Sequence, residues 1–262
     1  MNHWLFSIEP RRSGEENMRR DEAIAEACRV DGVPRLRLYS WQPWALSLGH
    51  NQDESQVDRA ALERAGIELV RRPTGGRAVL HAEELTYAVA MPASGEGVHE
   101  TYARISEALR RGLADVGAVD VEFTRSQPDF RTHYEQEDSA SCFSASALNE
   151  LSWQGRKLVG SAQRRYGAVL LQHGSLLVGP AHLSIVDFLF SSASPERRAA
   201  LMQRLAARTA TLADMLPDAI PAFEILARAL VGGFASTFDA LMSESAEITR
   251  LTNHADAQPA HS

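Results

Sequence analysis

The chain has 262 residues, of which 44% are hydrophobic and 23% are charged, a composition typical of a globular protein with a sizeable core. Its formal net charge of -7 argues against nucleic-acid binding. No long uncharged apolar run is present, so we expect no membrane span, and the N-terminus lacks the pattern of a secretory signal. The two cysteines, Cys28 and Cys142, have no paired spacing. We therefore expect no disulfide and no metal site, and a reducing cytoplasm as the location.

Helices and strands alternate in the first half of the chain. Apolar residues at helical spacing predict helices over 15–29, which places Cys28 in the core, and over 99–116. A shorter helix over 57–65 is predicted to end at Gly66. Strands are predicted over 35–40, 44–48, 67–71, 78–80, 85–91 and 119–123.

The second half begins with a polar, turn-rich loop over 127–141 that ends at Cys142. Strands over 158–165 and 168–178 form a hairpin at Gly167, and helices follow over 184–190, 195–215 and 221–242. These patterns predict an α+β fold with a mixed or antiparallel sheet, helices on one side and a helical C-terminal portion. We expect a single domain over residues 1–250 and a disordered tail over 251–262.

The basic residues are unusual because Lys157 is the one lysine among the 27 lysine and arginine residues. An ammonium is compact and can change its protonation state, whereas a guanidinium is wide and stays protonated. The lone lysine is therefore a candidate for chemistry, although chance can also leave a single lysine. Basic residues gather in two segments (Arg71, Arg72, Arg77, Arg156, Lys157, Arg164 and Arg165), which suits an anionic ligand or an acidic partner, or simply a solvated face.

Two glycine-containing segments are candidate binding regions. In the first, Gly75 and Gly76 allow close approach to a ligand, and the arginines beside them add hydrogen-bond donors. This segment supplies Arg72, Thr74, Gly75, Gly76, Arg77 and His81 as candidates, with a merely structural turn and a structural histidine as the alternatives. In the second, the small residues Gly160, Ser161 and Ala162 leave room for an aliphatic chain, and His173 and Gly174 lie opposite them in the predicted hairpin.

Cys142 is a candidate nucleophile at the end of the polar loop. A cysteine reacts as its thiolate, and the neighbouring acidic residues would raise the pKa of its thiol. A nearby cation is therefore needed, and Lys157 is the natural one. The alternative is an unreactive loop thiol.

Taken together, the motifs at 71–81, 84–87, 142–143, 155–163 and 172–175 resemble the biotin/lipoate protein ligase catalytic-domain superfamily. The resemblance covers about residues 15–245, with the motifs spread over about 32–240. It is closest to the octanoyltransferase branch that acts on the glycine-cleavage H protein, because Cys142-Phe143 precedes Lys157 by fifteen residues. One departure is Ala82, which stands where the family commonly has an acidic residue after the histidine.

The resemblance implies that octanoyl-acyl carrier protein donates the acyl group to Cys142, which holds it as a thioester. A lysine of a lipoyl-domain protein, the H protein, then accepts it as an amide. Lys157 lowers the pKa of the cysteine and positions the carbonyl, while the glycine-rich segments form the acyl pocket. No cofactor is implied.

Three other functions compete with this one. An ATP-dependent lipoate–protein ligase would use the same motifs to hold an acyl-adenylate, and an amidotransferase would move the acyl group between lipoyl domains. A binding module without catalysis would sense lipoate or an acyl carrier. A biotin ligase is disfavoured because the expected adenylate loop is absent.

Overall fold

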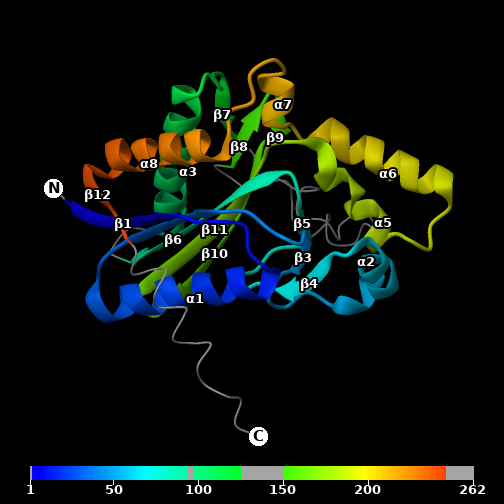
Figure 1. Ribbon diagram of the computed structural model, residues 1–262, viewed down its shortest axis with the longest axis horizontal. Helices are drawn as coiled ribbons and strands as arrows, with labels where there is room; N and C mark the ends of the chain where they lie inside the picture. Colours follow the sequence, from blue (N-terminus) through cyan, green and yellow to red (C-terminus); the bar gives the residue numbers. More distant parts are fainter. Residues whose placement is uncertain (1, 94–96, 125–149, 246–262) are drawn as a thin grey trace, which may run out of the picture.

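A computed structural model describes residues 2–93, 97–124 and 150–245, and a six-stranded mixed sheet forms its centre (Figure 1). Its strands run in the order β10-β11-β6-β2-β1-β12. The first four strands pair with one another in antiparallel fashion, whereas β1 is parallel to both β2 and β12. The strands are β1 (Asn2–Ile8), β2 (Arg35–Tyr39), β6 (Glu84–Pro92), β10 (Val159–Tyr166), β11 (Val169–Leu177) and β12 (Ala240–Glu244).

Helices cover both faces of this sheet. On one face α3 (Val98–Asp115) and α8 (Phe223–Phe238) enclose the largest core, where Leu36 and Val89 of the sheet meet Leu109 and Phe234 of the helices. On the other face α1 (Gly14–Asp31) lies across β6 and β11 (Figure 1). The expected α+β class with a mixed sheet is confirmed, while α1 departs from the expectation of helices on one side only.

A buried ionic cluster joins α1 to the sheet. Arg37 of β2 is fully buried and pairs with Asp21 of α1 and with Glu9, whose Oε1 lies 2.8 Å from Arg37 Nε. Arg20 of α1 also reaches Glu9, at 3.3 Å. Buried charges are tolerated when each finds opposite charge and hydrogen bonds, and here the cluster fixes α1 over β2.

A three-stranded sheet, in the order β4-β3-β5, lies beside the end of α1 and has its own core. Its elements and the helices around it are β3 (Ala45–Leu48), η1 (Glu54–Gln56), α2 (Arg59–Ala65), β4 (Glu68–Arg71), β5 (Val79–His81), η4 (Pro180–Ser184), α5 (Ile185–Leu189) and α6 (Pro195–Arg208). As predicted, α2 ends at Gly66, which adopts the left-handed conformation with φ of 66°.

A third sheet of β7 (Val121–Phe123), β8 (Leu151–Trp153) and β9 (Arg156–Lys157) leads into β10. The tight turn between β8 and β9 uses Gln154 and Gly155, both with positive φ, as two-residue hairpin turns require.

The C-terminal part differs from the predicted run of helices. The helix predicted over 195–215 breaks after α6, because the backbone at Thr209 bridges to Lys157 and Ala210 donates its N–H to the Lys157 carbonyl at 2.9 Å; the short α7 (Leu212–Met215) follows. The helix predicted over 221–242 ends at Phe238, and β12 continues beside β1. In the sequence, neither β1 nor β12 shows the alternation of polar and apolar residues that predicts a strand, and the two strands are stabilised by pairing with each other.

The expected loop over 127–141 and tail over 251–262 lie outside the described residues. Cys28 is buried as predicted, at 1% exposure, and burial raises the pKa of its thiol to about 11. Along the described parts of the chain, no helix combines the length and apolar character that crossing a membrane requires.

Candidate active site

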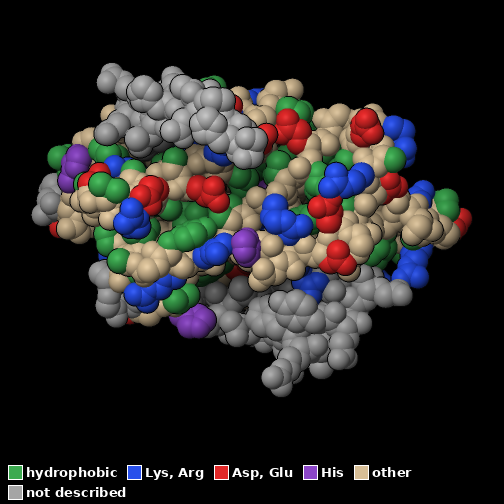
Figure 2. All heavy atoms as spheres, turned by 90° about the horizontal axis from the view of Figure 1, so that it is seen from below, with side chains coloured by type: hydrophobic (Ala, Val, Ile, Leu, Met, Phe, Trp, Pro, Cys, Tyr) green, Lys and Arg blue, Asp and Glu red, His purple; other side chains and the backbone are tan. Residues whose placement is uncertain are grey.

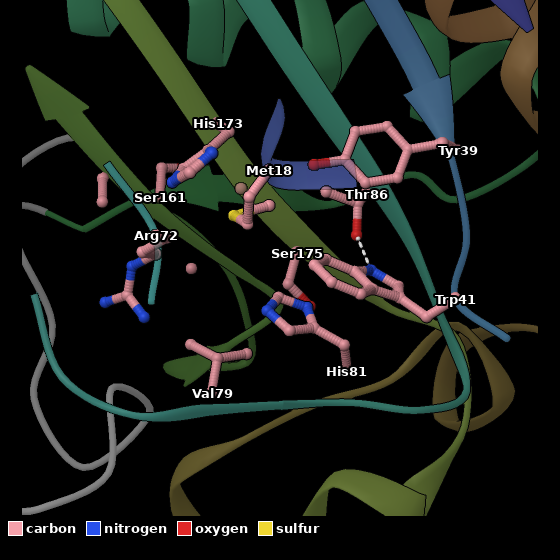
Figure 3. Close-up of a pocket in the computed structure, with 13 residues that line it drawn as sticks. Met18, Tyr39, Trp41, Arg72, Val79, His81, Thr86, Ser161, His173 and Ser175 are labelled. Carbon is pink, nitrogen blue, oxygen red and sulfur yellow. Dashed lines mark hydrogen bonds between the residues drawn. The ribbon is translucent and has the colours of Figure 1, made fainter. Parts of the chain in front are cut away.

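A cavity lies on the α1 side of the main sheet, with walls from this sheet, from the smaller β4-β3-β5 sheet and from α1 (Figure 3). About 350 Å³ of empty space, which includes solvent at the opening, lies between its walls. Its lining residues are Met18, Tyr39, Trp41, Arg72, Val79, His81, Thr86, Gly160, Ser161, Ala162, His173, Gly174 and Ser175.

The cavity extends across the strands. Gly160 of β10 lies opposite Ser175 of β11. Ser175 in turn lies opposite Thr86 of β6, and Thr86 lies opposite Tyr39 of β2. Neighbouring strands are about 4.8 Å apart, so these four strands span about 14 Å.

Most predicted substrate-binding residues meet here. Seven line the cavity: Arg72, His81, Gly160, Ser161, Ala162, His173 and Gly174. Four others, Thr74, Gly75, Gly76 and Arg77, belong to the loop between β4 and β5, next to it. Gly76 of this loop faces Ala162 of β10. Cys142 lies outside the described residues, so its meeting with Lys157 stays a prediction.

Arg72 organises the glycine-rich loop. Its Nε and Nη2 donate to the Gly75 carbonyl at 3.1 and 2.9 Å, and Nη2 also donates to the Arg77 carbonyl at 2.6 Å. Its Nη1 donates to the carbonyl and hydroxyl oxygens of Ser47 at 3.2 and 3.1 Å. Five hydrogen bonds match the five N–H groups of a guanidinium. The donors that we expected Arg72 to offer to an anion are therefore used to hold the loop in shape.

His173 belongs to a buried array that reaches from the loop to α1. Its Nδ1 lies 2.8 Å from Asp21 Oδ2, and its Nε2 lies 2.5 Å from Thr74 Oγ1. Burial lowers the pKa of His173, and the opposing effect of Asp21 is smaller, so the ring is neutral at pH 7. A carboxylate only accepts hydrogen bonds, so Nδ1 carries the proton and Nε2 accepts from the Thr74 hydroxyl.

His81 belongs to a similar array on the other side of the cavity. Its Nε2 lies 2.8 Å from Ser47 Oγ, and its Nδ1 lies 2.7 Å from Glu84 Oε1. Thr86 and Ser175 also donate to Glu84. Burial alone would raise the pKa of Glu84, but the electrostatic effect of the neighbouring His81 ring and the three hydrogen bonds outweigh it, and the pKa falls below its ordinary value.

Both arrays have the hydroxyl–histidine–carboxylate order of a catalytic triad. However, Ser47 and Thr74 are fully buried, and neither lines the cavity. A nucleophile must reach the substrate, so these hydroxyls are structural. The arrays instead fix the orientation of His81 and His173, whose ring nitrogens are both occupied.

Other polar residues of the wall also direct their polar atoms away from the cavity. Tyr39 donates its hydroxyl to Asp21 at 2.9 Å, and Trp41 donates Nε1 to Thr86 Oγ1 at 2.7 Å (Figure 3). Ser161 pairs with the Tyr87 hydroxyl at 2.7 Å. A wall built largely from polar residue types therefore presents mainly carbon, which suits an aliphatic ligand.

Two glycines let backbone segments approach closely around the cavity. A Cβ on Gly49 would lie 1.9 Å from the Gly76 carbonyl oxygen, so the loop after β3 packs directly on the glycine-rich loop. A Cβ on Gly174 would lie 2.7 Å from the Gly160 carbonyl oxygen. Substitutions at either position would push apart segments that shape the site.

Lys157 is the last residue of β9, separated from β10 by Leu158, and is buried at 2% exposure. Its Nζ lies 2.9 Å from Glu150 Oε1, and the Glu150 side chain is 3% exposed. A buried carboxylate at this distance favours the charged form of the amine. The one lysine of the chain is thus held as an ion pair next to the strand that carries Gly160, Ser161 and Ala162.

Acidic side chains lie against arginines of both basic segments identified in the sequence. Arg156 pairs with Asp214 at 3.4 Å, and Arg71 lies 3.8 Å from Glu54. Figure 2 shows blue and red side chains intermixed over the face seen from below, without a broad patch of one sign.

Several lining residues were not predicted from the sequence as site residues. Ser175 could have been found from the hairpin register, which places it opposite Gly160. Thr86 could have been found because it alternates with core residues along its strand. Met18, Tyr39, Trp41 and Val79 required knowledge of how α1 and the two sheets pack.

A family model, the Lipoyl protein ligase A/B catalytic domain, matches residues 13–235. With a match over most of the chain and a cavity of this kind, the chain belongs to this family. Octanoyltransferase LipM from Kyrpidia tusciae is 38% identical over 258 residues, covering 95% of this chain and 92% of that protein. Octanoyltransferase LipM from Exiguobacterium sibiricum is 37% identical over 246 residues, covering 89% and 86%. Within the family, the chain is an acyltransferase.

Solved structures support the fold. The bipartite lipoate protein ligase from Thermoplasma acidophilum superposes with a TM-score of 0.75 at 21% identity, covering 98% of this chain and 93% of that one. A lipoate-protein ligase A bound with ATP gives a TM-score of 0.72 at 21% identity, covering 98% and 96%. The expected biotin/lipoate ligase-like catalytic fold is thereby confirmed.

Proposed function

We propose that this acyltransferase moves an octanoyl group from octanoyl-acyl carrier protein to a lysine of a lipoyl domain, that of the glycine-cleavage H protein, in a reducing cytoplasm. The observation that carries the proposal is the cavity whose polar wall residues are bonded to one another. Such a wall accepts methylene groups without leaving buried donors or acceptors unpaired. The octanoyltransferases among the relatives support the same acyl group.

In the first step, the thiolate of Cys142 attacks the carbonyl carbon of the carrier thioester. A new carbon–sulfur bond forms, and the carrier leaves as its thiolate, which takes up a proton. The acyl chain then occupies the cavity, with its thioester at the β10 side. Covalent catalysis of this kind divides one transfer between two bulky proteins into two separate encounters.

In the second step, the neutral amine of the target lysine attacks the Cys142 thioester. The carbon–nitrogen bond of the amide forms, the carbon–sulfur bond breaks, Cys142 regains its thiolate, and the proton lost by the amine passes to solvent. One thioester is exchanged for another and then for a more stable amide, so no nucleotide is required.

Lys157 has two tasks in this proposal. Its ammonium lowers the pKa of the Cys142 thiol, and it positions the carbonyl of the acyl group. Glu150 supports both tasks, because its carboxylate keeps the amine protonated and in one place. The glycine-rich side of the site is shaped by Arg72, Thr74, Gly75, Gly76, Arg77 and His81. The side formed by the main sheet is shaped by Gly160, Ser161, Ala162, His173 and Gly174.

The deciding experiment supplies purified protein with octanoyl-carrier protein and H protein, without nucleotide, and follows octanoylation of the H protein by mass spectrometry. A parallel reaction contains octanoate or lipoate with ATP. A third uses octanoylated H protein as donor and another lipoyl domain as acceptor. Transfer in the first reaction supports the proposal, transfer only with ATP indicates a ligase, and transfer only in the third indicates an amidotransferase.

The covalent step has its own test. Incubation with octanoyl-carrier protein alone should add one octanoyl group that hydroxylamine removes, and the adduct should map to Cys142. The Cys142→Ala variant should lose both adduct and transfer, whereas Cys28→Ala, which changes only the buried cysteine, should retain both. Undiminished transfer by Cys142→Ala would exclude the covalent mechanism. Lys157→Arg should lose most activity, because the wider guanidinium displaces the charge.

A further inference from the structure

We propose that His182 and Thr209 are positioning residues for the reaction, because together they hold the backbone of Lys157 and thereby fix the place of its ammonium. The inference rests on the proposed function, in which that ammonium activates the nucleophile. Neither residue lines the cavity, and neither belongs to the motifs found in the sequence.

The backbone of Lys157 is held from two sides. On one side β9 pairs with β8, and Lys157 lies opposite Ser152. On the other side Lys157 forms a parallel bridge with Thr209, and the Ala210 N–H donates to the Lys157 carbonyl at 2.9 Å. The segment between α6 and α7 thus lies beside β9 as a further strand would (Figure 1). Any shift of this segment would move the Cα of Lys157 and, with it, the ammonium at the end of the side chain.

Thr209 is fixed in turn by its own side chain, since the residue is only 3% exposed. Its hydroxyl donates to the Leu205 carbonyl in the last turn of α6 at 2.9 Å, and the same oxygen lies 2.9 Å from Nε2 of His182. The Thr209 N–H also donates to the Leu205 carbonyl, at 3.0 Å. Hydrogen bonds weaken steeply when their geometry changes, so these contacts define where α6 ends and where the bridge to the lysine begins.

His182 connects this point to the wall of the acyl cavity. It lies in η4 and is 4% exposed. The helix η4 is attached to Glu83, whose carboxylate accepts the Ala181 N–H at 3.2 Å. The next residue along the chain, Glu84, holds the His81 ring that lines the cavity. A continuous set of contacts therefore joins the wall of the acyl cavity to the strand that carries the ammonium.

The distance between the ammonium and the thiolate decides how far the lysine can activate the cysteine. With an effective dielectric constant of about 20, moving a charge from about 4 to about 6 Å from its partner weakens the attraction by about a third. That loss raises the pKa of the thiol enough to leave about tenfold less thiolate at a pH below the pKa. Loss of the contacts at Thr209 should therefore slow the formation of the acyl-enzyme, which lowers kcat, and should leave KM for the carrier protein nearly unchanged.

The experiment compares two matched pairs of variants in the Cys28→Ala background, in which Cys142 is the one thiol. Thr209→Val removes the hydroxyl and keeps the branched shape, whereas Thr209→Ser keeps the hydroxyl. His182→Asn is too short to reach Thr209, whereas the longer side chain of His182→Gln places its amide at about the position of Nε2. The control is Thr211→Val, which removes the buried hydroxyl that caps α7 and leaves the bridge to Lys157 in place.

Three measurements report on the lysine. The pH dependence of alkylation gives the pKa of Cys142, and the kinetics of octanoyl transfer give kcat and KM. NMR of protein labelled with ¹³C at the lysine Cε gives one signal, because the chain contains a single lysine. In Thr209→Val and His182→Asn we expect a higher pKa of Cys142, a fall of about tenfold in kcat with little change in KM, and a shifted lysine signal. Thr209→Ser and His182→Gln should restore most of each property, and Thr211→Val should match wild type.

The lysine signal separates this proposal from the proposed function. If wild type transfers no octanoyl group, the proposed function fails, while a shifted lysine signal in Thr209→Val and His182→Asn still supports the positioning of the lysine. If Thr209→Val does not fold, as judged by circular dichroism, the two His182 variants carry the test. Folded variants whose lysine signal, kcat and pKa of Cys142 equal those of Thr211→Val would overturn the proposal.

Discussion

Asp21 anchors the histidine array of the site to helix α1, and its replacement by asparagine tests that arrangement. Asp21 is fully buried and accepts hydrogen bonds from Arg37, from the Tyr39 hydroxyl at 2.9 Å and from His173 Nδ1 at 2.8 Å. Asp21→Asn removes the negative charge and replaces one acceptor oxygen by an NH2 group. That NH2 group would then face one of the three donors, and no hydrogen bond could form between them.

The expected loss of stability follows from these contacts. A hydrogen bond to a charged group contributes about 1.5–3 kcal/mol, and breaking a buried ion pair costs about 3–5 kcal/mol. Arg37 keeps Glu9 as a second partner, so the lower end of that range applies. We expect the free energy of unfolding to fall by about 3 kcal/mol, out of a typical total of about 5–15 kcal/mol.

The assay is urea unfolding at pH 7, followed by circular dichroism. The control is Glu224→Gln, which removes a 55% exposed carboxylate paired with the equally exposed Arg228 and should cost less than about 1 kcal/mol. A loss below about 1 kcal/mol for Asp21→Asn would refute the idea that the buried cluster holds α1 against the sheet.

Three further predictions concern the site. The pKa of His173 is lower in the folded protein than in the unfolded chain, so the unfolded chain binds the proton more tightly. The contribution of His173 to the free energy of unfolding is therefore fully present above about pH 6.5 and declines as the pH falls below that value. In urea unfolding between pH 7.5 and 5, the His173→Gln variant should show a smaller decline in stability than wild type. The control His50→Gln changes an exposed histidine and should keep the wild-type decline. The same dependence of stability on pH in both variants would contradict the prediction. Lys157→Met should cost about 3–5 kcal/mol, because it removes the buried cation that lies against Glu150. Lys157→Met combined with Glu150→Leu should recover most of that stability but no transfer activity, and activity in the double variant would remove Lys157 from the mechanism. Gly174→Ala should lower the free energy of unfolding by about 1–3 kcal/mol and reduce transfer, because the added Cβ would lie 2.7 Å from a backbone oxygen of β10. Wild-type stability of this variant in thermal or urea unfolding would show that β10 and β11 can move apart at little cost.

Local sequence patterns were sufficient for elements whose residues alternate or repeat clearly. The helix α1, the hairpin at Gly167 and the cap at Gly66 follow from such patterns, and the structure has all three. The hairpin also brought His173 and Gly174 opposite the small residues of β10, so that half of the cavity wall could be predicted.

Features that depend on distant partners could not be predicted in this way. The strand β12 is stabilised by pairing with β1. A β-bridge between the backbones of Lys157 and Thr209 interrupts the helix that the composition of this segment favours. The role of Arg72 depends on which backbone carbonyls surround it, and the position of Trp41 depends on the packing of two sheets. Residue type indicated the kind of chemistry, while the hydrogen-bond partners determined which way each group points.

The burial of the only lysine also bears on self-modification. A protein that carries a reactive thioester holds the activated group beside its own surface for as long as the acceptor is absent, and any exposed lysine amine nearby could capture it irreversibly. Here the sequence contains a single lysine, and its amine is buried and bound to Glu150. An octanoyl-enzyme built on this chain would have no exposed lysine of its own to damage, so the activated group would remain for the partner that docks.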